Sequence, residues 1–510
     1  MEENRSNIRP YRLLAMCVLA FALALVAYHL ISAKMGFPAY RDIHLGTAIE
    51  YSQSKIDLLR PIIVGFNANK TPTAQELPIW QCAAAFFMKI GGGWYGWANL
   101  ASLLLFFPCL YPLFQITKQY YNVETAWWCL LLFLSQPLVF IFSGEAATDG
   151  FCLSLSLWFF YFCLKSIERR SFIYLIASML FGAILAISKL PYFVAYGVSA
   201  GLIFLFLKRN DLWAFIRLST IAVFAVVVFA IWTKYTNHLL SLALFPLVNL
   251  DTSKNPEMVF WYFGDLSYRL HLGNWIKGLW RLTNATCGSF TLLVLVAFGF
   301  VKQWRSLAAA ILAGCLLTTL IFTHLILHHS HYYLMYCPAF AIFGAIGICE
   351  IHRVFQKDHS GISLKFQCVA TAVLALSLVQ GLMGIHQVLQ FDPYPKKMAA
   401  IIDQWTNTNE NVIIRGGGWG GDLLFLSHRS GLSIWDTGFL DKSDNLESLK
   451  KLGYTKLVMV SESPLLHAIQ ITNPGAAEQK REFYEDSLIG NAKNWPSIYQ
   501  DEEICIKSIP

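Results

Sequence analysis

Long apolar runs constrain this chain more than any other feature of its sequence. Runs of about 20 hydrophobic residues, the length that a helix needs to cross a bilayer, recur from residue 12 to residue 387. Of the 510 residues, 56% are hydrophobic and only 14% are charged, whereas a soluble globular chain carries about 25% charged residues. The sequence therefore predicts a polytopic, all-α membrane protein.

The apolar runs predict about eleven membrane-spanning helices. We place these helices at 12–33, 97–117, 125–143, 150–166, 172–188, 192–207, 213–234, 287–302, 306–327, 333–350 and 364–387. The apolar stretch 79–91 is too short for a crossing, so we expect a re-entrant or interfacial helix there. The first run exceeds the apolar core of a signal peptide, and we interpret it as a retained helix.

The distribution of Lys and Arg predicts how the helices are oriented. With the arginine-rich N-terminus in the cytoplasm, every predicted cytoplasmic turn is basic, as the positive-inside rule requires. The long loops 34–96 and 235–286 and the tail 391–510 then all lie on the outer side. We therefore expect a protein of the inner (plasma) membrane that functions at its periplasmic or extracellular face.

The tail differs from the rest of the chain in its pattern of residues. After a membrane domain at 1–390, it alternates short predicted helices and strands, which is typical of a small α/β domain at 391–510. The predicted elements are a helix at 396–406, a strand at 412–416, a helix or strand at 423–427, a helix at 444–452 and a strand at 456–460. The glycine-rich stretch 415–422 matches neither phosphate-binding fingerprint, so we interpret it as a turn.

Charge and cysteine patterns restrict the partners. The net charge of +7 follows from the basic cytoplasmic turns, and no basic surface interleaved with aromatic residues indicates nucleic acid. Cysteines fall mostly inside predicted helices and show no metal-type spacing. The expected surroundings are membrane lipids, with no nucleic-acid partner.

Ionisable residues gather at the outer ends of the apolar helices, where they cost energy and are candidates for function. They are Arg41 and Asp42 after the first helix, Glu145 and Asp149 before the fourth, Lys189 in a later turn, and His328, His329 and His331 in another. Each alone is also typical of a solvated helix end. Together they could displace a phosphate, because a carboxylate can deprotonate an acceptor while cations stabilise the leaving group.

The first outer loop carries a recognisable pattern. The run YRDIHLGTAIEY is followed by LLRP at 58–61 and by ELPIWQ at 76–81. It resembles the first outer loop of the glycosyltransferase C superfamily, in particular bacterial relatives of dolichyl-phosphate-mannose-protein mannosyltransferase and lipid A aminoarabinose transferase. Asp42 and Pro78 match the acidic residue and the proline of that pattern. The loop departs from it because Ile43 stands where many relatives carry a second acid, and Glu50 lies nearby.

The resemblance continues along the chain to about residue 350. Asp149 opens a helix in ATDGFCLSL, a Lys-x-Pro turn holds Lys189, and HYYLMYCPAF at 331–340 resembles an aromatic segment of the superfamily. The order and loop placement of these segments carry the similarity more than their identity does.

The resemblance implies a glycosyltransferase that uses a polyprenyl-phosphate-linked sugar and a lipid, glycan or protein acceptor. It implies that Asp42 is the catalytic base of an inverting displacement and that Asp149 is a second acid. It also implies that Arg41, Lys189 and His331 bind the donor phosphate. Further candidates for substrate binding are Glu76, Glu145, His329, Tyr332, Tyr333 and Arg269. No metal or other cofactor is required by these residues, although a carboxylate pair could hold a divalent ion.

Two other functions stay open at this point. Ionisable residues in a helical bundle also mark transport paths, so a transporter or flippase of a lipid-linked or envelope substrate is the alternative, although no internal repeat supports it. A non-catalytic component of the cell envelope is the third. The aromatic loop 235–286 is either an interfacial belt or a lid over the site.

Overall fold

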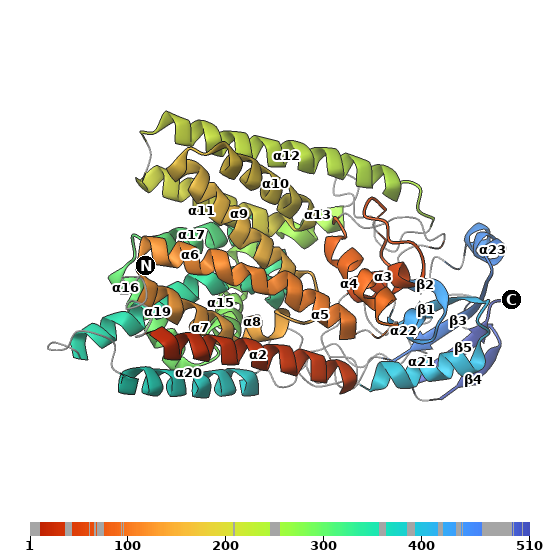
Figure 1. Ribbon diagram of the computed structural model, residues 1–510. Helices are drawn as coiled ribbons and strands as arrows, with labels where there is room; N and C mark the ends of the chain where they lie inside the picture. The colour runs from red at the N-terminus through yellow and green to blue at the C-terminus, as the bar shows by residue number, and fades with distance from the viewer. Residues whose placement is uncertain are drawn as a thin grey trace. The chain divides into compact units, whose positions relative to one another are not determined.

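The computed structural model describes residues 11–35, 43–60, 62–65, 68, 76–92, 94, 96–207, 210–244, 256–355, 364–384, 393–416, 422–434, 440, 442–461, 492, 494–501 and 503–510. The chain divides into two compact units (Figure 1). Unit 1 comprises Met1–Ile31, Asn99–Trp232 and Pro256–His386, and unit 2 comprises Ser32–Ala98, Thr233–Asn255 and Gln387–Pro510. Each unit is described by itself.

Unit 1 is built from helices that run through most of the chain. They are α2 (Arg12–Met35), α5 (Gly96–Phe106), η2 (Phe107–Cys109), α6 (Leu110–Tyr120), α7 (Val123–Ser135), α8 (Pro137–Phe142), α9 (Asp149–Arg169), α10 (Phe172–Ser188), α11 (Leu190–Leu207), α12 (Leu212–Leu240), α13 (Pro256–Phe263), α14 (Leu266–Leu270), α15 (Leu272–Thr286), α16 (Phe290–Lys302), α17 (Leu307–Ile321), α18 (Thr323–His328), η3 (Ser330–Tyr336), α19 (Cys337–Phe355) and α20 (Leu364–Gly384). The most extensive packing joins α9 to α10, α16 to α19 and α11 to α17 (Figure 1).

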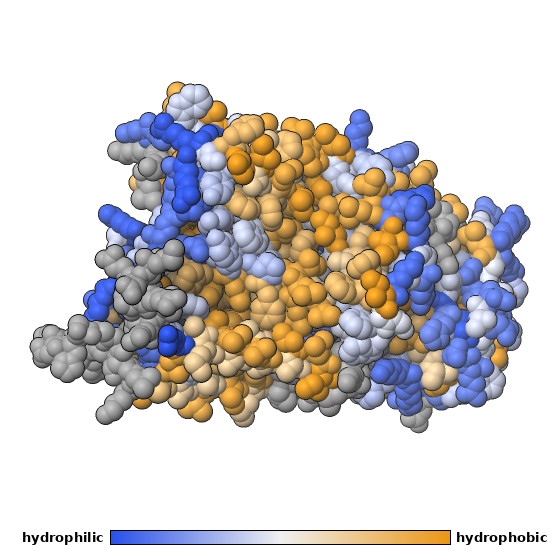
Figure 2. All heavy atoms as spheres, in the orientation of Figure 1, coloured by the Kyte–Doolittle hydropathy of each residue, from blue (hydrophilic) through white to orange (hydrophobic). Residues whose placement is uncertain are grey.

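Unit 1 has the apolar exterior of a membrane protein. Six helices in the described part of the chain are long and apolar enough to cross a bilayer, or seven if the bent pair α15 and α16 is one span. Large apolar side chains such as Ile173, Phe206 and Val301 are 70–77% exposed, and hydrophobic residues cover the flank visible in Figure 2. Such a surface is stable against lipid. The polytopic membrane fold is confirmed, and the count of about eleven spans stays a prediction.

Several predicted spans are interrupted for local reasons. The span expected at 125–143 is divided between α7 and α8 because Pro137, which has no N–H to donate, follows Gln136 in extended conformation. The span expected at 306–327 is divided at Phe322 between α17 and α18. Helix α16 meets α15 at 103°, across Gly288, whose φ of 66° favours glycine.

Unit 2 contains the predicted α/β domain. Its elements are α21 (Tyr394–Trp405), β1 (Asn411–Arg415), α22 (Asp422–Leu426), β2 (Ser430–Ile434), α23 (Ser443–Lys451), β3 (Tyr454–Val460), β4 (Ser497–Gln500) and β5 (Ile504–Ser508). The strands form one sheet in the order β2-β1-β3-β5-β4, with β1 parallel to β2 and β3, and β5 antiparallel to β3. Separate apolar clusters, centred on Leu457 and on Val458, pack on the two faces. The predicted helices and strands are confirmed, and β2, β4 and β5 are additional.

Unit 2 also includes residues 34–96, the predicted first outer loop, which the predicted domain 391–510 did not contain. Helices α3 (Ile43–Gln53) and α4 (Ile79–Ile90) pack together, and α3 also packs against α22. The backbone N–H of Ser433, on the outer edge of β2, donates to the carbonyl oxygen of Gly65 at 2.8 Å. An unpaired strand edge favours such a partner, which explains why this loop belongs with the α/β domain. The predicted short helix at 79–91 is present as α4.

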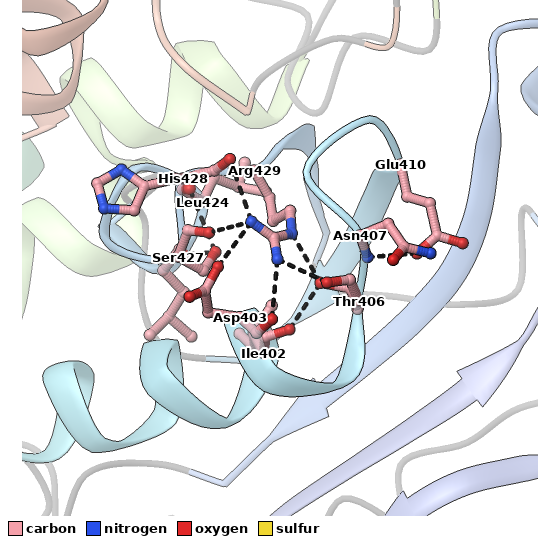
Figure 3. A network of polar contacts seen from close by, with 10 residues as sticks. Ile402, Asp403, Thr406, Asn407, Glu410, Leu424, Ser427, His428 and Arg429 are labelled. Carbon is pink, nitrogen blue, oxygen red and sulfur yellow. Dashed lines mark hydrogen bonds and ion pairs between the residues drawn. The ribbon is translucent and has the colours of Figure 1, made fainter.

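A buried arginine fastens the α/β domain internally (Figure 3). Arg429 is 6% exposed, and its guanidinium donates to the backbone carbonyls of Asp403, Thr406 and Ser427 at 3.0, 2.6 and 2.7 Å. It also donates to the Thr406 hydroxyl at 2.8 Å and pairs with the Asp403 carboxylate at 2.8 Å. These bonds tie the end of α21 to the turn after α22.

Candidate functional site

A buried ion pair marks the centre of the candidate site in unit 1. Asp149 is the first residue of α9, and Lys189 lies at the break between α10 and α11, with φ −160° and ψ 88°. The Lys189 Nζ atom lies 2.8 Å from Asp149 Oδ1, and the two side chains are 6% and 1% exposed. Burying either charge alone would be very costly, so the two predicted site residues depend on each other.

Aromatic side chains surround this pair. The Tyr192 hydroxyl lies 3.4 Å from Asp149 Oδ1 and 3.4 Å from the backbone carbonyl oxygen of His331. The Tyr332 ring centroid lies 5.0 Å from Lys189 Nζ, within range of a cation–π interaction. The structure thus brings Asp149, Lys189, Tyr332 and the backbone of His331 together. Sequence reasoning missed Tyr192, although a buried tyrosine directly after a Lys-x-Pro turn signals a polar partner.

Four histidine rings extend from this site. The His331 ring lies 4.5 Å from the Tyr332 ring and 5.2 Å from the His329 ring, measured between centroids. His328 continues the series at 4.9 Å from His329 and 5.3 Å from His324. Burial, and then the positive charges of His331, His328 and Lys189, lower the pKa of His329 to about 2. His329 is therefore a neutral hydrogen-bonding group at ordinary pH.

Three other predicted residues of unit 1 take part in local packing. Arg269, in α14, donates to the backbone carbonyls of Phe263 and Ile321 at 2.8 and 3.1 Å and so joins the end of α13 to the end of α17. Tyr333 is buried in η3. The backbone carbonyl of Glu145 accepts a hydrogen bond from the Ser102 hydroxyl at 2.7 Å. These contacts support the fold, and the predicted substrate contacts of the three residues stay predictions.

Unit 2 contains a separate polar cluster, in the first outer loop. The Gln81 side-chain amide lies 2.6 Å from His44 Nδ1, and His44 Nε2 lies 3.4 Å from the Glu76 carboxylate. If the amide donates to Nδ1, the proton of a neutral imidazole lies on Nε2 and faces Glu76. Sequence reasoning included Glu76 but missed His44, two residues after Asp42. Arg41 and Asp42 lie outside the described residues.

The described residues of the two units include no group of three or more His, Cys, Asp and Glu side chains arranged to hold a metal ion. Hydrogen bonds and ion pairs join the side chains of the His44, Glu76 and Gln81 cluster and of the Asp149–Lys189 pair.

Solved structures with the same architecture exist. No protein-family profile and no curated protein matches the sequence. ArnT from Cupriavidus metallidurans superposes with a TM-score of 0.56 in the apo state and 0.58 when bound to undecaprenyl phosphate, at 13% identity, over 97% of this chain and 98% of ArnT. An oligosaccharyltransferase from Archaeoglobus fulgidus gives a TM-score of 0.50 at 11% identity, over 89% of this chain and 70% of the other.

A mycobacterial arabinofuranosyltransferase, AftD, gives a TM-score of 0.52 at 13% identity, over 98% of this chain and 41% of AftD. The TM-scores of 0.50–0.58 show a shared fold, and at identities of 11–13% a shared fold does not imply a shared substrate. These structures belong to the superfamily that the outer loops of this chain resemble. The chain therefore has the fold of the glycosyltransferase C superfamily of membrane proteins.

Proposed function

We propose that this protein is a membrane glycosyltransferase that moves a sugar from a polyprenyl-phosphate donor to an acceptor outside the cytoplasm. The observation that carries the proposal is the buried Asp149–Lys189 pair in a glycosyltransferase C fold. The Tyr192 hydroxyl contacts Asp149, and the Tyr332 ring contacts Lys189. An ammonium group in a water-poor site stabilises growing negative charge far better than one in water. The undecaprenyl phosphate bound to ArnT, which shares the fold, supports a lipid-phosphate donor.

The reaction assigned to this site is a single inverting displacement. An acceptor hydroxyl or amine attacks the anomeric carbon, the bond from that carbon to the phosphate oxygen breaks, and polyprenyl phosphate leaves with the electron pair. The acceptor proton passes to Asp42, the proposed base, which is assigned from the sequence pattern alone. The phosphate is neutralised by Lys189 with Arg41 and His331, and Asp149 orients Lys189 and the substrate.

The remaining candidates are assigned to substrate binding. Glu76, held beside His44, is assigned to the acceptor or the sugar, since a carboxylate accepts hydrogen bonds from hydroxyl groups. Neutral His329 and the Tyr332 ring are assigned to binding of the sugar. Glu145, Tyr333 and Arg269 are assigned to further contacts with the substrates. No step in this scheme needs a metal, and a divalent ion that assists the leaving phosphate is tested by chelation.

The topology belongs to the same proposal. The N-terminus is assigned to the cytoplasm and the α/β domain to the periplasmic or extracellular side of the inner (plasma) membrane. Single cysteine substitutions in the turn at 169–171 and in α23 test this topology. Each is labelled with a membrane-impermeant thiol reagent, first in intact cells and then in permeabilised cells. Labelling of the turn from outside would contradict it.

Donor binding tests the proposal independently of the acceptor. Purified protein in detergent is titrated with a panel of polyprenyl-phosphate sugars, and the same titration is made with Lys189→Met. We expect one donor to bind to the wild type and binding to fall about 100-fold in Lys189→Met, because a desolvated phosphate loses its cation. Absence of binding by every lipid-linked sugar would overturn the proposal and favour a transport protein.

A further inference from the structure

The first outer loop makes a continuous set of hydrogen bonds with the α/β domain inside unit 2. The Gly65 carbonyl oxygen accepts from the Ser433 N–H at 2.8 Å. Three residues further on, the Ala68 carbonyl oxygen accepts from the buried Tyr454 hydroxyl at 3.1 Å. The loop thus adds to the outer edge of β2 and reaches as far as β3, the middle strand of the sheet. These bonds fix the register of the loop on the domain.

Apolar packing repeats the same connection on both faces of the sheet. Val64 packs against the cluster that contains Leu423 and Val458. Ala68 is 5% exposed and belongs to the opposite cluster, with Leu432 and Tyr454. One short segment of the loop therefore takes part in both cores of the domain. A segment that merely crossed the surface would not need this placement.

The docked segment also holds α3. The Thr47 hydroxyl, in the middle of α3, donates to the carbonyl oxygen of Ile62 at 2.7 Å, and the Tyr51 hydroxyl donates to the carbonyl oxygen of Arg60 at 2.7 Å. Helix α3 begins at Ile43, the residue after Asp42 in the sequence. Thr47 is 1% exposed and Tyr51 is also 1% exposed, so these bonds are shielded from water.

Gly65 occupies a position where a side chain would disturb this docking. Its φ is 82°, and a Cβ atom there would lie 3.1 Å from Leu424 Cδ1 and 3.2 Å from Ser433 Cβ. Both the backbone conformation and the close approach to β2 therefore favour glycine. Gly453 offers a matched comparison within the same domain. Its φ is 80°, but a Cβ atom there would approach only the Asn411 side-chain amide, at 3.5 Å.

We infer that the α/β domain positions the first outer loop for catalysis, with Gly65, Thr47 and Tyr454 as positioning residues. Covering the edge of β2 would by itself need only Gly65 and its neighbours. The bonds continue instead through Ile62 to Thr47 and so to the helix that follows Asp42. This inference rests on the proposed function, because it assigns to the domain the task of holding the loop that carries the proposed base.

The test compares Gly65→Ala with Gly453→Ala in the full-length protein. Both substitutions place Ala at a positive φ, so they share the backbone cost, and only Gly65→Ala disturbs the loop. We expect Gly65→Ala to lower kcat for sugar transfer about 10- to 100-fold, with the KM for the donor changed less than about twofold. In the same variant, hydrogen exchange of α3 amides should accelerate. Gly453→Ala should leave kcat and α3 exchange unchanged.

A milder pair repeats the test without altering the backbone. Tyr454→Phe removes the hydrogen bond to Ala68, and Tyr499→Phe removes a hydroxyl that donates to Asp501, in the β4–β5 turn, at 2.8 Å. We expect Tyr454→Phe to lower kcat about 3- to 10-fold, the range for one lost hydrogen bond. Tyr499→Phe should have the wild-type kcat.

The outcomes separate this inference from the proposed function. If the wild type transfers no sugar from any donor, the proposed function fails, while α3 exchange still reports whether the domain holds the loop. If Gly65→Ala leaves α3 exchange unchanged, the domain does not hold the loop. If α3 exchange accelerates but kcat stays at the wild-type value, the loop is held for stability and the positioning role is overturned.

Discussion

Two buried cations show how differently this chain uses charge in its two units. In unit 2, Arg429 directs its guanidinium to four backbone carbonyls, one hydroxyl and the half-exposed carboxylate of Asp403 (Figure 3). In unit 1, Lys189 pairs with Asp149, a second ionisable side chain that is itself 1% exposed. Backbone carbonyls neither ionise nor move away, so the bonds of Arg429 hold two segments of the backbone together. The Asp149 side chain can ionise and can move, so Lys189 could bind a substrate anion in its place, which suits this pair to a functional role.

The largest expected effect separates the stability of the ion pair from its function. Lys189→Met should destabilise the protein by about 3–5 kcal/mol, because it leaves the Asp149 carboxylate buried without its cation, and should lower transfer about 1000-fold or more. The double variant Asp149→Asn with Lys189→Met should recover most of the stability and none of the activity. Thermal unfolding in detergent and sugar transfer measure the two effects, and a double variant with wild-type activity would show that the pair is structural.

Arg429 should give the opposite result. Arg429→Met should lower the stability of the α/β domain by about 2–4 kcal/mol, since several buried carbonyls lose their donor. Activity per folded molecule should stay at the wild-type level. Asp403→Ala serves as the control and should cost less than about 1 kcal/mol, because its carboxylate is half exposed. A changed donor affinity in folded Arg429→Met would break the contrast between the two cations.

Two tyrosines on one helix sharpen the comparison within unit 1. Tyr192 lies beside Asp149, whereas Tyr196, one turn along α11, donates to the Met335 carbonyl oxygen at 3.1 Å. Both are fully buried. Tyr192→Phe should reduce transfer about 3- to 10-fold with little loss of stability, while Tyr196→Phe should cost about 1 kcal/mol of stability and leave kcat unchanged. Equal effects of the two variants on kcat would remove Tyr192 from the site.

The remaining expected effect concerns the dependence of stability on pH. Since burial lowers the pKa of His329 to about 2, from about 6.5 in the unfolded chain, the unfolded state binds the proton first as pH falls. Stability should therefore be unaffected by His329 above about pH 6.5 and decline below it, by at most about 1.4 kcal/mol per pH unit. Thermal unfolding between pH 7.5 and 5 should show a shallower decline in His329→Gln than in the wild type. An unchanged slope would mean that His329 is solvated.

The fold could be predicted largely because a bilayer imposes strong rules on sequence. Apolar length identified the helices of unit 1, and alternating helices and strands identified the α/β domain. Strand β2 was missed because SGLSI at 430–434 contains a glycine and lacks strict alternation. The break at Gln136 was missed although Pro137 is a local signal for it, because a proline can also lie inside a kinked helix. The break at Phe322 has no proline or glycine to mark it, so helix packing decides where that apolar run bends.

The candidate site was predicted in part, for a similar reason. Asp149 and Lys189 could be expected to meet, since buried charges near the same membrane depth require partners. Tyr192 and His44 were not found, because a polar role for either depends on which residue of another helix lies opposite. The docking of Gly65 and Ala68 on the α/β domain was also beyond the sequence. The segments involved lie more than 350 residues apart, and no pattern in either one identifies the other.

Sugar transfer in proteoliposomes tests the central claim most directly. The proteoliposomes contain the purified wild type, Asp42→Asn or Asp57→Asn, and they are supplied with radiolabelled polyprenyl-phosphate sugars and an envelope extract as acceptor source. Asp57 is the control, because it is another carboxylate of the first outer loop and its side chain accepts a hydrogen bond from the Leu59 N–H. We predict transfer by the wild type and Asp57→Asn, and a loss of about 1000-fold or more in Asp42→Asn with donor binding retained. Wild-type transfer by Asp42→Asn would contradict the assignment of the base, and absence of transfer from every donor would contradict the proposed function itself.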